Sequence, residues 1–179
     1  MDQPAVILEY WFSPQVATHW FASTPALDDE IRARFEPLWQ QAAAGGLDHW
    51  ADTPEGALAL AIVLDQLPLH MYRGQMLAHA SERQAVAVAK AAVARQFHAR
   101  LPRDRLLFLF MPLMHSEDGA DQALSVSLFQ EAGLDTRWPE HHRDLILRFG
   151  RFPHRNAVLG RASTREELDY LASGQAFKG

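Results

Sequence analysis

The 179-residue chain contains no cysteine, which excludes disulfide bonds, thiolate metal sites, iron–sulfur clusters and cysteine nucleophiles. Long apolar runs are also absent. The two longest, Ala57–Leu64 and Leu106–Met114, fall far short of the roughly 20 residues that a membrane-spanning helix needs. The N-terminal Met-Asp-Gln-Pro lacks the basic residues that open a signal peptide. We therefore expect a soluble cytoplasmic protein with no membrane partner.

Lysine is scarce, since 15 of the 17 basic residues are Arg. Residues 1–80 contain three Arg and ten acidic residues, a net charge of −7, whereas residues 81–161 contain 12 basic and nine acidic residues, a net charge of +3. The overall charge of −5 argues against a nucleic-acid partner, which would need a basic surface. The planar Arg guanidinium favours fixed ion pairs or contacts with small anions.

The common catalytic strings are missing as well: there is no Gly-x-Ser-x-Gly, His-Glu-x-x-His, Walker loop or Gly-x-Gly-x-x-Gly. The histidines form no pair spaced four residues apart on one helix, and the abundant Arg would repel a cation. We therefore predict no metal site and no cofactor. The missing strings argue against the commonest enzyme classes but leave other enzymes possible.

The residues that are present can build a large core, because 48% are apolar and only 22% are charged. No Gly- or Ser-rich linker divides the sequence, and no strict repeat is visible, so we expect residues 1–179 to form a single domain. Strand signals are almost absent. The run Leu106–Met111 could be a buried strand, but a lone strand has no partner, and the run also fits a buried helix.

Residues typical of helix ends divide the chain into helices. Thr53-Pro54-Glu55 is a typical N-cap and first turn, and Thr164 precedes a turn that is rich in acidic residues. Ser81 and Gln84 have the spacing of a capping box. Two further helices are expected at Ser116–Gly133 and Trp138–Gly150. The sequence predicts an all-α antiparallel array of about seven to nine helices.

Three polar segments interrupt these apolar surroundings. The first is Asp65-Gln66, at the end of an almost wholly apolar helix, where a carboxylate is desolvated and needs a partner. Asp65 is either structural, as a buried ion-pair partner or a cap on a neighbouring helix, or functional, as a ligand contact or a general base. If Arg151 or Arg155 neutralises it, Asp65→Ala should cost roughly 3–5 kcal/mol.

The second segment is His115-Ser116-Glu117-Asp118, which follows the apolar run. Ser116 suits an N-cap, and the two acids suit a first helical turn. His115 is either a structural group or a proton carrier.

The third and densest segment is 141–161, which holds five Arg, three His and one acidic residue. His142 shares a helix face with Leu145 and Ile146 and should point inward. Gly150 and Pro153 break that helix, and irregular backbone with several Arg is a good receptor for an anion. The alternative is that these Arg neutralise Asp65, Glu117 and Asp118, and both interpretations can hold together.

Several strings resemble the bacterial Domain of Unknown Function 924 family over almost the whole chain. The most specific is Phe149-Gly-Arg-Phe-Pro-His-Arg-Asn156, and the others are Tyr10-Trp-Phe12, Trp20-Phe21, Leu64-Asp-Gln-Leu-Pro68, Tyr72-Arg-Gly74, Pro112–Asp118, Leu159-Gly-Arg161, Ser163-Thr164 and Glu166-Glu167. The resemblance implies a tetratricopeptide-like superhelix of helical hairpins and a polar patch from the same three segments. It implies no activity. Where the family usually has a basic residue after Asp-Gln-x-Pro, this chain has Leu69 and then His70.

The leading hypothesis is a single pocket for a small anionic or carboxylate-bearing ligand. Its expected lining comprises Asp65, Gln66, Arg73, His115, Glu117, His142, Arg151, His154, Arg155 and Asn156. Two alternatives remain. One is a metal-independent hydrolase or transferase that uses His115 or His154 as acid or base. The other is a helical module that binds a peptide or a partner protein on its concave face.

Overall fold

The computed structural model describes residues 3–174 and 176 of the chain. Its α-helical segments are α1 (Gln3–Trp11), α2 (Pro14–Ala17), α3 (Pro25–Ala43), α4 (Pro54–Ala61), α5 (Leu67–Met71), α6 (Glu82–Ala94), α7 (Leu106–His115), α8 (Gly119–Glu131), α9 (Arg137–Phe149) and α10 (Arg165–Ala172). The short 3-10 or π segments are η1 (Asp48–Asp52), η2 (Ile62–Gln66), η3 (Met76–His79), η4 (Phe97–Arg100), η5 (Arg103–Arg105) and η6 (Pro153–Arg155).

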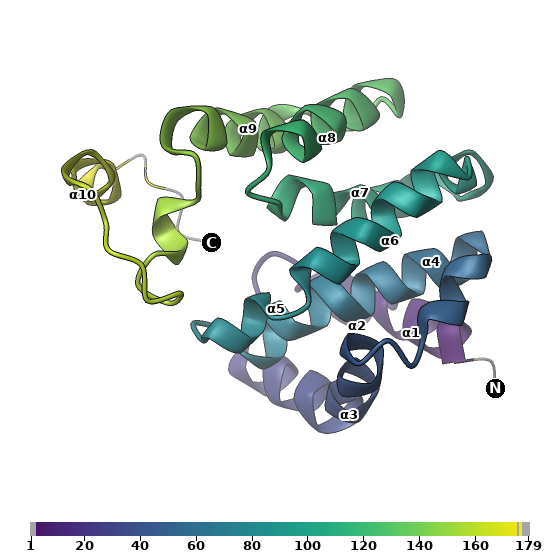
Figure 1. The fold of residues 1–179 in the computed structure, drawn as a ribbon. Coiled ribbons are helices and arrows are strands. Elements are labelled where there is room, and N and C mark those ends of the chain that lie inside the picture. Colours follow the sequence, from purple (N-terminus) through teal and green to yellow (C-terminus); the bar gives the residue numbers. More distant parts are fainter. Residues whose placement is uncertain (1–2, 175, 177–179) are drawn as a thin grey trace.

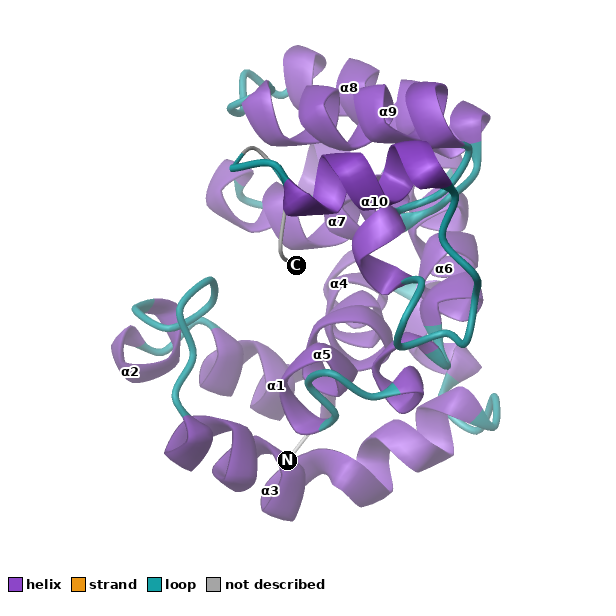
Figure 2. Ribbon diagram, turned by 90° about the vertical axis from the view of Figure 1, so that its left-hand side faces the viewer, coloured by secondary structure: helices purple, strands orange, loops and turns teal. Residues whose placement is uncertain are grey.

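The fold is all-α, as predicted, and residues 3–174 contain no strand (Figure 2). The run Leu106–Met111 belongs to α7, because its neighbours are helices and offer no strand with which to pair. The segments α4, η2 and α5 follow one another without a break from residue 54 to residue 71. Counted as one rod, they reduce the ten described α segments to nine helices, within the expected range.

α4 lies near the middle of the molecule, where α1, α6 and α7 pack against it (Figure 1). α3 packs against α5 on one side, and α6, α7, α8 and α9 follow in sequence on the other. Every residue from Ala57 to Leu64 is buried. This is why the α4–η2 rod carries almost no polar residues until Asp65, and why that aspartate lies deep in the molecule.

The rod changes its winding at η2, which is a π-helical turn. The N–H of Leu67 donates to the carbonyl of Ile62, five residues back. The carbonyl of Leu64 accepts a hydrogen bond of 2.6 Å from Ser81 Oγ, which itself accepts one of 2.9 Å from Trp39 Nε1. Turns of this type often lie at functional sites, and this one ends on the buried Asp65-Gln66 pair.

Local sequence signals predicted several helix ends correctly. Thr53 caps α4, with Pro54 at its first position, and Thr164 forms a capping box with Glu167 at the start of α10. Gly150 ends α9 with φ 70°, in the left-handed region that glycine favours.

Two helix starts differ from the prediction. The predicted capping box at Ser81 is wrong: Ser81 does precede α6, but its hydroxyl donates to Leu64 instead of capping the helix. The helix expected from Ser116 begins only at Gly119, because Asp118 is the N-cap and accepts from two backbone N–H groups. The hydroxyl of Ser116 instead donates to Asp121.

A second, smaller core holds the C-terminal part of the chain in place. Leu145 and Ile146 of α9 pack there with Phe152 and with Tyr170 of α10. Phe152 has no exposed surface and directly precedes η6. This small core therefore fixes η6, with its His and Arg residues, in position. No helix in the described part of the chain is long and apolar enough to cross a membrane.

Candidate functional site

Hydrogen bonds join the three polar segments at the end of α7. His115 is the last residue of α7, and its Nδ1 lies 2.9 and 3.0 Å from the two carboxylate oxygens of Asp65 in η2. Its backbone carbonyl accepts a hydrogen bond of 3.1 Å from Nη1 of Arg155 in η6. One residue from each segment thus contributes to a single connected cluster around His115.

Asp65 is buried, with 2% of its surface exposed, and two side chains satisfy its carboxylate. His115 contacts both oxygens, and Gln66 Nε2 donates to Oδ2 over 2.6 Å. Because a carboxylate accepts hydrogen bonds, Nδ1 of His115 is the donor, and in the neutral ring Nε2 presents a lone pair. The hypothesis that Arg151 or Arg155 neutralises Asp65 is therefore wrong, because an imidazole and an amide occupy the carboxylate.

Arg155 is 6% exposed, and the hydrogen bonds of its guanidinium to the described residues all use Nη1. Its Nη1 donates to Glu82 of α6 and to the carbonyl of His115, each over 3.1 Å. Its guanidinium carbon lies 4.6 Å from the ring centroid of Phe152. Its Nε is buried and has no hydrogen-bond partner among the described residues. Glu82 also contacts Nδ1 of His79 over 2.7 Å.

His142 projects from α9 toward this cluster and is 4% exposed, as the helix periodicity predicts. Its ring centroid lies 6.3 Å from that of His115 and 5.5 Å from that of Phe152. Burial is the main cause that lowers the pKa of His142 to about 3, and repulsion from His115, whenever that ring is protonated, acts in the same direction. The ring is therefore neutral at physiological pH.

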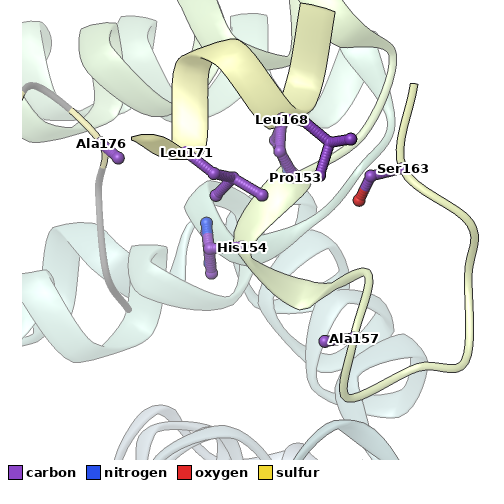
Figure 3. Close-up of a pocket in the computed structure, with 7 residues that line it drawn as sticks. All are labelled: Pro153, His154, Ala157, Ser163, Leu168, Leu171 and Ala176. Carbon is purple, nitrogen blue, oxygen red and sulfur yellow. The ribbon is translucent and has the colours of Figure 1, made fainter. Parts of the chain in front are cut away.

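His154 also contacts Phe152, with 5.6 Å between the two ring centroids. Burial and the neighbouring Arg155 charge lower the pKa of His154 to about 4. His154 also lines a cavity of about 370 Å³ between η6 and α10, and its ring points toward Leu171 (Figure 3). The other lining residues are mainly apolar and comprise Pro153, Ala157, Ser163, Leu168, Leu171 and Ala176.

Glu117 holds the loop around η6 in place through hydrogen bonds. It accepts two hydrogen bonds from Arg161, of 2.6 and 2.9 Å, and one of 2.7 Å from the backbone N–H of Phe152. Burial opposes its ionisation, but the Arg161 and Phe152 hydrogen bonds outweigh burial and lower the pKa of Glu117. Arg161 also donates to Asn156 Oδ1 over 3.1 Å. Glu117 is thus neutralised by an Arg, and Glu117 and Asn156 shape the loop around η6.

Two of the residues proposed for the pocket are bound elsewhere. Arg151 donates to Glu167 over 2.6 and 2.8 Å and so ties the end of α9 to α10. Arg73 donates to Asp28 of α3 over 3.0 and 3.3 Å, beside the buried His70. The described hydrogen bonds connect neither Arg to the Asp65–His115 pair. Whether any of the ten residues binds a ligand remains a prediction.

Three further residues of the cluster could not be identified from the sequence: His79, Glu82 and Phe152. Glu82 lies in the first turn of α6, and nothing local indicates that its carboxylate reaches Arg155 across 73 positions. Phe152 belongs to the family string, but nothing in the sequence indicates that its ring packs against His142, His154 and Arg155. Within the described residues, no group of three or more His, Asp or Glu side chains is arranged to hold a metal ion.

The two neutral histidines predict that acid destabilises the protein. In the unfolded chain both titrate near pH 6.5, so the unfolded state binds more protons between about pH 6.5 and 4. Stability therefore falls as the pH drops through that window. His142 alone should cost about 2 kcal/mol at about pH 5.

Urea denaturation at a series of pH values measures this loss. His142→Gln should reduce the slope of the unfolding free energy against pH by the equivalent of about one bound proton. His49→Gln, at an exposed position in η1, should leave this slope unchanged. Equal slopes in wild type and His142→Gln would contradict the assignment.

Comparison with known proteins agrees with the resemblance seen in the sequence. The family model described as bacterial protein of unknown function matches residues 7–175. The solved structure of a protein of unknown function from Agrobacterium tumefaciens is 36% identical, with a TM-score of 0.89 over 96% of this chain and 98% of that one. No curated protein is significantly similar. Because the model match covers nearly the whole sequence, the chain belongs to the Domain of Unknown Function 924 family.

Proposed function

We propose that the protein binds a small ligand through a carboxylate, and that the guanidinium of Arg155 is the receptor. The observation that carries the proposal is the buried Nε of Arg155, a hydrogen-bond donor without a partner in the described chain. A buried donor left without an acceptor costs about 1–3 kcal/mol, so an acceptor supplied by a ligand would be strongly favoured.

The geometry of the guanidinium indicates a carboxylate. The protein's hydrogen bonds to Arg155 use Nη1, whereas Nε and Nη2 form the side edge that binds the two oxygens of a carboxylate in parallel. The other four Arg of the segment are less suited, because each is occupied by an acidic side chain: Arg143 by Asp144, Arg148 by Glu166, Arg151 by Glu167 and Arg161 by Glu117.

The cavity beside η6 supports a ligand with an apolar part. Pro153 and His154, which line it, directly precede Arg155 in the chain, and its other walls are mainly aliphatic. A volume of about 370 Å³ lies within the range of small-molecule sites. A short carboxylic acid could therefore place its hydrocarbon part against these walls and its carboxylate toward the segment that carries Arg155.

The test is to measure the binding of acetate, benzoate and succinate by calorimetry and thermal shift, with inorganic phosphate as a comparison anion. We expect at least one carboxylate to bind saturably to wild type, and at least tenfold more weakly to Arg155→Lys, which keeps the charge but loses the fork. Arg83→Lys, at an exposed position of α6, is the matched control.

A second variant separates binding from folding. Glu82→Gln removes the ion pair of Arg155 and leaves its side edge intact, so carboxylate binding should persist. Wild-type affinity in Arg155→Lys, or no carboxylate binding to the wild type, would overturn the proposal.

A further inference from the structure

We infer that the Asp65–His115 pair is a general base that activates water for hydrolysis of an ester whose acid portion carries a second carboxylate. The inference rests on the proposed function, because the second carboxylate is the group that Arg155 would hold. It goes beyond binding, since it assigns a reaction to a part of the cluster that a simple receptor would not need.

The first support is the state of His115. Both oxygens of the buried Asp65 face Nδ1 of His115, and Gln66 holds the carboxylate from the other side. This arrangement fixes the proton on Nδ1 and leaves Nε2 as the basic atom. A carboxylate behind an imidazole also stabilises the imidazolium that forms when Nε2 takes a proton.

The second support is the accessibility of His115. Nε2 makes no hydrogen bond to the described part of the chain, and the side chain retains 14% exposure although Asp65 is almost fully buried. The charged or titratable groups near it include Asp65 from η2, His142 from α9, and His154 and Arg155 from η6. The neutral His142 does not compete for a proton above about pH 4.

The backbone around His115 is held firmly. Gln122 of α8 has no exposed surface, and its amide donates to the carbonyls of Met114 and Ser116 over 2.7 and 2.6 Å. Arg155 binds the carbonyl of His115 itself. The base and the carboxylate receptor are thus joined through one residue, which is the preorganisation that acid–base chemistry requires.

The nucleophile and the substrate class follow from what surrounds the base. The chain has no cysteine, and no described Ser or Thr hydroxyl is bonded to His115, so water is the nucleophile. Arg155 offers one cationic edge, which matches one carboxylate, whereas a phosphoester would bring up to two negative charges to it. A carboxylic ester places a neutral reacting group beside His115.

The reaction balances without a redox partner. Nε2 takes a proton from water while the water oxygen bonds to the ester carbonyl carbon. The tetrahedral intermediate then collapses, the bond between the carbonyl carbon and the alcohol oxygen breaks, and the proton on Nε2 passes to the leaving oxygen. The products are an alcohol and a carboxylic acid, which releases its proton to solvent to give the dicarboxylate, and His115 returns to its starting state.

The probe is mono-(4-nitrophenyl) succinate, with 4-nitrophenyl acetate as the analogue that lacks the second carboxylate. We expect wild type to hydrolyse the succinate ester with turnover and to prefer it to the acetate. His115→Gln should lower kcat/KM by roughly 100-fold or more, the usual contribution of a positioned base. His49→Gln, at an exposed position of η1, should match the wild type.

Two further measurements separate a chemical role from a structural one. Asp65→Asn, which no longer favours the Nδ1 proton, should also lose rate, and the loss should lie in kcat rather than in KM. The wild-type rate should rise with pH through a single titration that is absent in His115→Gln. Succinate binding to His115→Gln, measured by calorimetry, shows whether that variant is folded.

The outcomes distinguish the two claims. If succinate binds through Arg155 but wild type does not hydrolyse the ester, or His115→Gln is as fast as wild type, the inference fails and the proposed function stands. If hydrolysis depends on His115 but Arg155→Lys binds succinate and hydrolyses the ester like wild type, the carboxylate receptor is wrong and the base assignment stands.

Discussion

Replacement of Phe152 by Ala should lower the free energy of unfolding by about 4 kcal/mol, the largest effect we expect from a single side chain near the site. Phe152 has no exposed surface and lies at the centre of the small C-terminal core. Its ring also contacts the rings of His142 and His154 and packs against the Arg155 guanidinium. Loss of the ring leaves a cavity there and removes the surface against which Arg155 packs.

Urea denaturation measures this effect, and Phe21→Ala is the matched control because Phe21 is 73% exposed and should change stability by less than about 1 kcal/mol. The Phe152 variant should also bind carboxylates more weakly, since its Arg155 is less well ordered. A loss of stability as small as that of Phe21→Ala would show that Phe152 is not the packing centre of this region.

Replacement of Asp65 by Ala should lower the free energy of unfolding by about 3 kcal/mol. The change leaves the buried Gln66 amide and the Nδ1 donor of His115 without their shared acceptor, and each such donor costs about 1–3 kcal/mol. Unlike a guanidinium, an imidazole can be uncharged, so no permanent charge is left buried. The loss should therefore lie at the lower end of the 3–5 kcal/mol expected for an Arg partner.

Asp52→Ala is the control for Asp65→Ala, because the Asp52 side chain is 76% exposed in its contact with Arg95. Surface ion pairs of this kind contribute about 0–1 kcal/mol. An effect of Asp65→Ala below about 1 kcal/mol, by the same denaturation measurement, would place Asp65 in contact with solvent and contradict the buried pair with His115.

Helix ends could be predicted from the sequence where the deciding contacts are local. The caps at Thr53 and Thr164 and the stop at Gly150 each depend on atoms within four residues, so their residue types were sufficient. Ser81 shows where this fails. Its hydroxyl has a partner 17 residues away at the π-helical turn, and that long-range hydrogen bond replaces the predicted capping box.

For the candidate site, too, the sequence predicted local properties but not long-range contacts. The apolar context of Asp65 and the helix face of His142 indicated burial, and both are buried. The choice of partner was not predictable, because an acid can pair with any of several Arg or His residues until the fold determines which one lies within reach. In the folded chain Asp65 pairs with His115, Glu117 with Arg161, and Arg155 with Glu82.

The central claim, a carboxylate held by Arg155, is tested most directly by the ¹H–¹⁵N resonance of its Nε–H group during titration with succinate. The resonance can be assigned by its disappearance in Arg155→Lys. We predict a saturable shift with the same Kd as calorimetry gives, because a new hydrogen bond forms at Nε. An Nε resonance that stays in place while succinate saturates the protein, or a protein that succinate does not saturate, would contradict the claim.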